Sequence, residues 1–205
     1  MSKKKRSSFR GKVRSDSERQ NKAASSYGYL ILPKDVNVYN PPPGGTAKLD
    51  FIPYEVSDKH HMDRNEELEI GIPETLWYKR PFKTHREIGI DNESVVCLSS
   101  IGKKCPICEK RAELIKNGAD KEDTDFLRPK LRNLYAVIPH DSKDHEQEIH
   151  IWDMSQWLFQ NLLNDELEED EDNEIFPDLE EGKIVKTRFS EEKYKKNTFA
   201  SRTRH

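Results

Sequence analysis

The chain has 205 residues, of which 36% are charged and 33% are hydrophobic, and its formal net charge is −3 at pH 7. This length suits one domain with small appendages, and the low hydrophobic content predicts that part of the chain is extended or disordered. No apolar run approaches the roughly eighteen residues of a membrane helix, and no signal peptide is recognisable. We therefore expect a soluble protein of a reducing compartment, with no membrane partner.

Charge is segregated along the chain. The first fourteen residues hold seven Lys and Arg residues and no acid, whereas residues 165–181 hold eleven acidic residues and no basic one. Such blocks are typical of a chain that meets a polyanion with one part and keeps another part away from it. Residues 1–26 lack hydrophobic periodicity. They are interpreted as a solvated tail, as a localisation signal, or as a basic arm that orders on nucleic acid or on a neighbouring subunit.

Two stretches before the cysteines carry strand and binding signals. Residues 47–53 alternate apolar and polar side chains, which predicts a half-buried strand, and the polar segment 55–67 predicts a loop. In 76–83 aromatic and basic residues are interleaved, an arrangement that lets bases stack on rings while phosphates meet cations. Trp and Tyr in a strand are also typical of a core, so this stretch alone does not decide between the two.

All three cysteines of the chain lie within twelve residues. Cys105 and Cys108 form a Cys-x-x-Cys turn, which directs two thiolates at one tetrahedral metal ion, and Cys97 precedes them. A structural zinc ion takes four such ligands and leaves no open position. We predict that His85 is the fourth, in the spacing His-x11-Cys-x7-Cys-x2-Cys. The expected cofactor is one structural Zn²⁺.

Roles for the cysteines that involve no metal fit the sequence less well. Unrelated buried cysteines are not expected to cluster in this way. A disulfide would leave an odd thiol, and nothing indicates an oxidising compartment. A redox Cys-x-x-Cys needs a strand-helix-strand context that the neighbouring residues do not offer. The fourth ligand has two alternatives to His85, namely His60 and His61.

Basic residues flank the Cys-x-x-Cys turn. Lys103 and Lys104 stand directly before Cys105, where they either compensate the charge of zinc-bound thiolates or face a phosphate backbone. The sequence leaves both interpretations open. After the turn, residues 109–117 have helical spacing and end at Gly118, which suits a C-cap.

The second half of the chain begins with a predicted hairpin. A basic approach over 126–132 leads into a strand at 133–138, Pro139 and the polar run after it predict a turn, and the alternating segment 148–152 predicts the partner strand. A short turn between two such strands favours antiparallel pairing. We therefore expect them to be neighbours in a sheet.

The hairpin is followed by a helix, an acidic segment and two strand patterns. Ser155 is expected to cap an amphipathic helix over 156–168, with Trp157 among its apolar residues. The acidic residues over about 165–181 predict a solvated loop. The strand predicted at 182–189 places Lys186 and Arg188 on one face, and a strand pattern resumes at 198–202.

These elements predict a mainly β fold. Short strands, few helices and basic and aromatic residues favour an OB-fold barrel with an inserted zinc-binding subdomain over about 83–118 and a few short helices. The predicted organisation is a basic arm over 1–26 followed by a core over 27–205.

The succession of motifs resembles a known family. It runs from Lys-Arg-Ser-Ser (5–8) through Gly-x-Ala-x-Leu-x-Phe-Ile-Pro (45–53) and the His…Cys…Cys-Pro-Ile-Cys insertion to Asn-Leu-Tyr-Ala-Val-Ile-Pro (133–139) and Gly-Lys-Ile-Val-Lys-Thr-Arg-Phe (182–189). Over roughly residues 3–200 this order is similar to the single-stranded DNA-binding, helix-destabilising protein of T-even and related bacteriophages. The metal insertion is the specific part of the resemblance, because the strand matches are generic.

The resemblance implies a binding protein without enzymatic activity, which coats single-stranded DNA with little sequence preference during replication, recombination and repair in the cytoplasm of an infected bacterium. It implies partners among replication and recombination proteins, and contact between copies along the strand. The arm residues for that contact are Lys3, Lys4, Lys5, Arg6, Ser7 and Ser8. The candidate DNA contacts are Tyr78, Lys79, Arg80, Phe82, Lys83, Lys103, Lys104, Arg128, Lys130, Arg132, Tyr135, Lys186, Arg188 and Phe199.

Two departures from the family pattern matter. An aromatic pair expected before the Asn-Leu-Tyr strand is Lys130-Leu131 here, so base stacking is assigned to Tyr78, Phe82, Tyr135 or Phe199. The family also ends in an acidic tail that recruits replication partners, which is missing from this chain, so either the tail was cut off or recruitment works differently. The internal acidic run 165–174 is not its equivalent.

Two other functions compete with this interpretation. One is a zinc-ribbon and β-barrel adaptor of transcription or replication machinery. The other is a zinc-dependent nucleobase deaminase, whose His-x-Glu and Pro-Cys-x-x-Cys signature is not met because Pro106 lies inside the Cys-x-x-Cys turn and His85-Arg86-Glu87 gives only the His-x-Glu part.

Overall fold

The computed structural model describes residues 29–33, 36–42, 44–194 and 197–202, with side chains up to residue 190. The chain divides into two compact units, Met1–Asp35 and Val36–His205. In the first unit the described residues, 29–33, contain no helix or strand. The basic arm expected over 1–26 lies outside the described residues.

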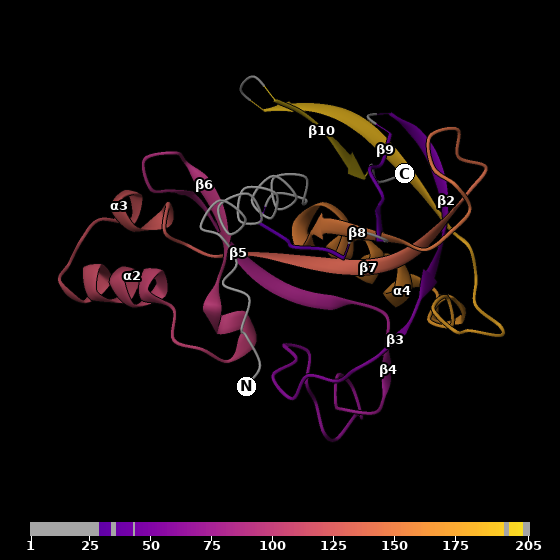
Figure 1. Cartoon of the computed structure of the whole chain (residues 1–205), viewed down its shortest axis with the longest axis horizontal. Helices are drawn as coiled ribbons and strands as arrows, with labels where there is room; N and C mark the ends of the chain where they lie inside the picture. The colour runs from indigo at the N-terminus through magenta and orange to yellow at the C-terminus, as the bar shows by residue number, and fades with distance from the viewer. Residues whose placement is uncertain (1–28, 34–35, 43, 195–196, 203–205) are drawn as a thin grey trace, which may run out of the picture. The chain divides into compact units, whose positions relative to one another are not determined.

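The second unit is mostly β-sheet with a few short helices (Figure 1). The strands are β1 Asn37–Val38, β2 Gly45–Ile52, β3 Tyr54–Glu55, β4 Leu76–Trp77, β5 Arg80–Ile88, β6 Glu93–Val96, β7 Lys130–His140, β8 His150–Ser155, β9 Val185–Tyr194 and β10 Asn197–Arg202. The helices are α2 Pro106–Lys116, α3 Lys121–Asp125 and α4 Asn161–Glu169, with 3-10 turns at Leu98–Ile101 and Glu171–Asn173 and a π-helix at Gln156–Gln160. Across the described ranges, every helix is too short or too polar to span a bilayer.

Strand β7 is the branch point of the main sheet. The sheet runs β1-β8-β7-β2-β9-β10, and β5 also pairs with β7 while β6 pairs with β5. One edge of β7 is hydrogen-bonded to β8; the other is shared by β5, along the first half of β7, and β2, along the second half. Among the described strands the path does not return to its start, so the sheet is open.

Alternating side chains explain why these segments are strands. In β2, Leu49 and Phe51 are buried while Lys48 is exposed, as the sequence predicted. In β9, Thr187 and Phe189 are buried while Lys186 and Arg188 face outward, which confirms the predicted faces. Inward apolar residues on both strands join one core, because β2 and β9 are paired neighbours.

Aromatic rings form the centre of that core. The rings of Phe51 and Phe159 stack at 5.8 Å, and Trp152 meets Phe159 edge-on at 4.6 Å. Tyr135 and Phe176 pack edge-on against Phe51 as well. The π-helix therefore contributes to the core of the sheet by inserting Phe159 among rings from β2, β7 and β8.

The hairpin prediction was correct in pairing but wrong at its turn. Strands β7 and β8 are antiparallel neighbours, as expected. Strand β7 nevertheless continues through Pro139, which lies opposite Leu49 of β2. Within the described residues, the part of β7 beyond Val137 pairs with β2 alone. A proline is tolerated at such a half-paired position because no second ladder needs its N–H.

The helix after β8 differs from the prediction in its first turn. Ser155 ends β8 and its side chain makes no capping hydrogen bond, and residues 156–160 form a π-helix that continues into α4. Side chains two residues apart point to different sides of a helix. Because Phe159 is fully buried, Trp157 points outward and is 76% exposed rather than part of the core.

The acidic segment 165–181 is not simply a loop. It includes the end of α4 and the 3-10 turn Glu171–Asn173, and buried Phe176 anchors it to the core. The carboxylates themselves are mostly exposed, as predicted. An apolar anchor thus fixes a segment that the charge pattern alone describes as solvated.

The core arrangement predicts very unequal losses of folding stability for alanine substitutions at two aromatic residues on the same turn. Phe159→Ala should lower the free energy of unfolding by about 3–5 kcal/mol, because it leaves a cavity among packed rings. Trp157→Ala should change it by less than about 0.5 kcal/mol, because the side chain is exposed. Urea denaturation measures both, and equal losses would contradict the described core.

Candidate metal centre

The β5–β6 hairpin places the first two ligand side chains. His85 lies opposite Val95, and the N–H of Cys97 donates to the carbonyl of Lys83 at 2.8 Å, which extends the ladder beyond β6. Residues two apart on a strand share a face. His85 and Cys97 are therefore diagonal neighbours on the same face of the hairpin.

The start of α2 places the other two. Cys105 is the N-cap of α2, Pro106 is its first residue, and Cys108 follows one turn later. Proline suits this first position because its missing N–H would be unpaired there anyway. The positive end of the helix dipole favours thiolates over thiols at such a site. The turn that leads into it contains Gly102, whose positive φ of 70° suits a glycine.

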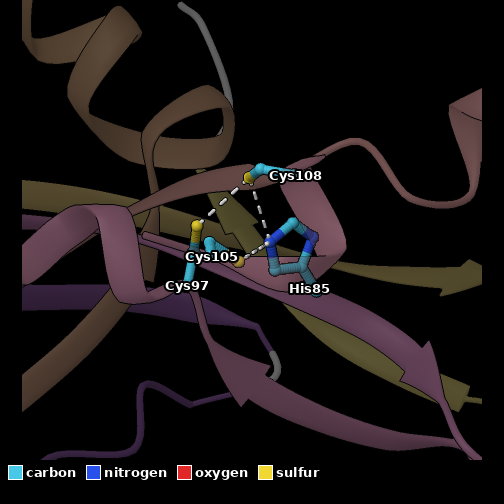
Figure 2. A group of neighbouring side chains, drawn as sticks. All are labelled: His85, Cys97, Cys105 and Cys108. Carbon is cyan, nitrogen blue, oxygen red and sulfur yellow. Dashed lines mark hydrogen bonds between the residues drawn. The ribbon is translucent and has the colours of Figure 1, made fainter. Parts of the chain in front are cut away.

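The four side chains converge on one point, as Figure 2 shows. Nε2 of His85 is 3.4 Å from Sγ of Cys105 and 3.5 Å from Sγ of Cys108, and Sγ of Cys97 is 3.5 Å from that of Cys108. All four ligand atoms lie within 4.8 Å of one another. Ligands at about 2.0–2.3 Å around a tetrahedral ion are about 3.3–3.8 Å apart. The group therefore has the dimensions to hold one metal ion.

Hydrogen bonds orient the ligands. Nδ1 of His85 is 3.0 Å from the carbonyl oxygen of Leu127, which can only accept, so Nδ1 carries the proton and Nε2 presents its lone pair to the sulfur atoms. Oγ of Ser99 lies 3.1 Å from Sγ of Cys97. Oγ of Ser100 accepts from the N–H of Lys83 at 2.7 Å and ties the 3-10 turn to β5.

The crowded environment shifts the pKa values of Cys105 and Cys108 in opposite directions. Burial raises the pKa of Cys108 to about 12, together with its hydrogen bonds to the sulfurs of Cys97 and Cys105. Burial acts in the same direction on Cys105, but hydrogen bonds from the backbone of Cys108 and from Cys97 outweigh it and lower its pKa to about 6. Three thiolates this close repel one another, so they require a cation to be charged together.

The two alternative histidines lie outside this group. Nε2 of His61 is 2.8 Å from the hydroxyl of Tyr54, and its Nδ1 accepts from the N–H of Asp63 at 3.1 Å, so both ring nitrogens are occupied. His60 is exposed, and its ring lies against Gly102, where an added Cβ would come within 2.7 Å of it. The structure therefore selects His85 among the three candidates.

Several predicted DNA contacts gather around this centre from three segments. Lys83 is two residues before His85 on β5, Lys103 and Lys104 lead into Cys105, and Arg128 and Lys130 follow the carbonyl of Leu127 that accepts from His85. Lys83 is half-buried and the other four are exposed. No described carboxylate forms an ion pair with any of them.

Three other predicted cations have carboxylate partners. Lys79 pairs with Asp63 at 2.9 Å, and Arg80 pairs with Asp58. Nε of Arg132 lies 2.7 Å from the buried carboxylate of Asp153, with which it forms a largely buried pair. The positive charges of these three residues are therefore balanced by carboxylates of the protein itself. The sequence had placed them among the DNA contacts because cross-strand and loop partners are not visible in it.

The predicted stacking aromatics are mostly inside the protein. Tyr135 is buried and its hydroxyl donates to Oε1 of Gln160 at 2.7 Å. Tyr78 accepts from Nε2 of the same glutamine at 2.8 Å and packs on the core, and Phe82 is buried. The structure thus buries Phe82 and Tyr135 and half-buries Tyr78, and base stacking by these rings stays a prediction. Phe199 lies on β10, and its side chain is not among those described.

Lys186 and Arg188 are exposed on the outer face of β9. In Figure 1, α2 and α3, which flank the metal centre, lie at the left, whereas β9 begins on the right, where it pairs with β2. The structure thus separates these two residues from the five cations at the centre. The predicted DNA contacts on β9 and those at the metal centre are therefore two separate groups.

Trp157, which the sequence placed among the apolar residues of the amphipathic helix, is exposed. In the β7–β8 ladder, Ser155 pairs with Arg132, so Trp157 follows the end of the ladder on the side where β7 begins at Lys130. Trp157 lies in the π-helix, and the sequence pattern had predicted an ordinary α-helix there.

No protein-family model and no curated protein matches this chain.

The geometry predicts which substitutions release the metal. Cys97→Ser and Cys105→Ser should each lower the metal content of the purified protein from one molar equivalent to well below it, because a hydroxyl is a poor replacement for a thiolate. His60→Ala and His61→Ala should retain the full equivalent. Elemental analysis after dialysis against a weak chelator checks this. Loss of metal from His61→Ala but not from His85→Ala would contradict the described ligand set.

Proposed function

We propose that this chain is a single-stranded DNA-binding protein with little sequence preference, of the type found in bacteriophages. The observation that carries the proposal is the set of five cations, Lys83, Lys103, Lys104, Arg128 and Lys130, that three segments bring to the metal centre without described carboxylate partners. Unpaired cations at a rigid site attract a polyanion. The basic sequence of residues 1–14 adds a second positive element.

The ion in the centre is proposed to be Zn²⁺ with a structural role. Three thiolates and one imidazole are a donor set that zinc commonly takes, and four protein ligands leave no position for a reacting water. The bound ion would neutralise the thiolates and fix β5, β6 and α2 relative to one another. The neighbouring lysines are then not needed as counter-charges for sulfur, and they remain available for phosphates.

The DNA-binding platform is proposed to be an OB-type barrel built from the sheet around β7. Its branching, with β5 and β2 sharing one edge, supports a sheet that curls toward closure. Phosphates would contact the cations at the metal centre while exposed Trp157 stacks on a base. Each stacked base contributes about 1–3 kcal/mol.

Helix destabilisation would follow from binding alone. Duplex stacking is worth roughly 1.4 kcal/mol per step, so a protein that gains more than this along an exposed strand shifts the equilibrium toward single strands. The proposed arm, residues 3–8, would contact the next copy along the strand and make binding cooperative. Replication and recombination proteins are the expected partners, and the proposed setting is the cytoplasm of an infected bacterium.

Neutralising cations at the metal centre should weaken DNA binding through charge. The double variant Lys103→Gln with Lys104→Gln should bind oligo(dT) more weakly and reduce the slope of log affinity against log salt by about 1.4, since each lost phosphate contact on a single strand removes about 0.7. Fluorescence anisotropy at several salt concentrations measures this. Lys143→Gln, on the exposed β7–β8 loop, is the control. An unchanged slope would contradict the proposed interface.

Tryptophan fluorescence tests the stacking role of Trp157. The chain has three tryptophans: Trp152 is buried, Trp77 is half-buried and donates to Asp63 at 2.9 Å, and Trp157 is exposed. Oligo(dT) should quench the native protein and Trp77→Phe, whereas Trp157→Phe should lose most of the quenching. If Trp157→Phe is quenched like the native protein while still binding DNA, the ring does not stack.

A further inference from the structure

A groove lies between β4 and the segment that follows α4. It has a volume of about 390 Å³ and shares no residue with the metal centre. One wall comes from Pro53 and Leu76–Trp77 with Tyr78, the other from residues 174–180. A site of this size accommodates one or two large side chains of a peptide rather than a folded domain.

The walls of the groove are apolar and exposed. Leu179 is 62% exposed and Leu76 is 53% exposed, with Ile175 beside them. Three large aliphatic side chains that gather around one depression are unusual on a chain so rich in charge, because each exposes surface that water disfavours. Such an arrangement indicates a surface that another molecule covers.

The rim of the groove is acidic. Glu174, Asp178 and Glu180 line it, and no lysine or arginine does. They belong to the stretch with eleven acidic and no basic residues. A rim of this charge repels a phosphate backbone and attracts a cationic peptide. The groove therefore suits a different partner from the cations at the metal centre.

The acidic wall is held in place before any partner binds. The carboxylate of Asp178 accepts from the N–H groups of Glu180 and Glu181 at 2.8 and 2.9 Å. Buried Phe176 packs edge-on against the ring of Tyr78 at 5.1 Å. A Cβ on Gly182 would come within 2.2 Å of the carbonyl of Asp178, so the wall closes tightly on itself. A prepared wall lowers the entropy cost of docking.

We propose that this groove docks a short Lys- and Arg-rich segment of a partner protein, with a bulky apolar side chain of that segment inserted between Leu76 and Leu179. The apolar walls account for the anchor, and the rim carboxylates account for the flanking cations. The acidic rim keeps the groove clear of the phosphate backbone, so a partner can bind while the basic residues are engaged elsewhere. The proposal does not depend on the DNA-binding function.

A defined peptide tests the groove in the full-length protein. The probe is a fluorescein-labelled twelve-residue peptide with two leucines flanked by lysines, measured by anisotropy. Leu179→Ser should weaken its binding by about ten-fold, which corresponds to the loss of about 1.4 kcal/mol of apolar contact. Glu174→Gln with Glu180→Gln should weaken it several-fold and reduce its salt dependence. The matched controls, Ile90→Ser at a 95% exposed position and Glu109→Gln on α2, should bind like the native protein.

Three results would overturn the proposal. A peptide with serines in place of leucines that binds equally well would show attraction to charge alone. Equal binding by the groove and control variants would place the peptide elsewhere. Self-association that is lost both in Leu179→Ser and on deletion of residues 1–14 would assign the groove to a second copy of this chain instead of a partner protein. Thermal melts establish that each variant is folded, and unchanged oligo(dT) affinity of Leu179→Ser separates this test from that of DNA binding.

Discussion

The mutual repulsion of three sulfur atoms is the constraint on which much of this structure depends. Cys97, Cys105 and Cys108 are held within a few ångströms of one another and of His85, although they come from a hairpin and a separate helix. Without a cation, burial and the neighbouring sulfur atoms raise the pKa of Cys108 and favour its protonated form. When a cation is bound, the three sulfur atoms and the imidazole nitrogen can all coordinate it. The ion would then join the hairpin, α2 and the segment after α3, whose carbonyl at Leu127 orients the imidazole.

Charge is distributed over the second unit in two separate regions. The cations near the metal centre lack described carboxylate partners, whereas other cations, such as Lys79 and Arg132, are held in ion pairs. Three carboxylates, those of Glu174, Asp178 and Glu180, line the groove beside Leu179. The net charge of −3 belongs to the whole chain and describes neither group of residues. The residues of the proposed peptide groove are not those of the metal centre, so the two proposals concern separate parts of the chain.

The sequence predicted those features that depend on local spacing. The Cys-x-x-Cys turn at a helix start, the alternation of β2 and β9, and the β7–β8 hairpin all follow from residues near one another in the chain. Features that depend on distant partners were missed. The ion pair of Arg132 with Asp153 and the hydrogen bond of Tyr135 to Gln160 could not be predicted from neighbouring residues. Each joins residues more than twenty positions apart that meet only in the folded protein. Trp157 was misassigned for a related reason, since the π-helix that turns it outward reflects the packing of Phe159 rather than a local pattern.

The close contact between Gly102 and the ring of His60 links two regions that are far apart in the chain. Gly102 belongs to the turn that delivers Cys105, while His60 belongs to the loop whose Asp58 holds Arg80 at the start of β5. The ring of His60 lies over this turn, and a side chain at position 102 would displace the ring. Because Gly102 has no side chain, the turn before Cys105 can lie directly against a segment that supplies no ligand. The surroundings of the metal centre therefore include a loop more than forty residues upstream of Cys105.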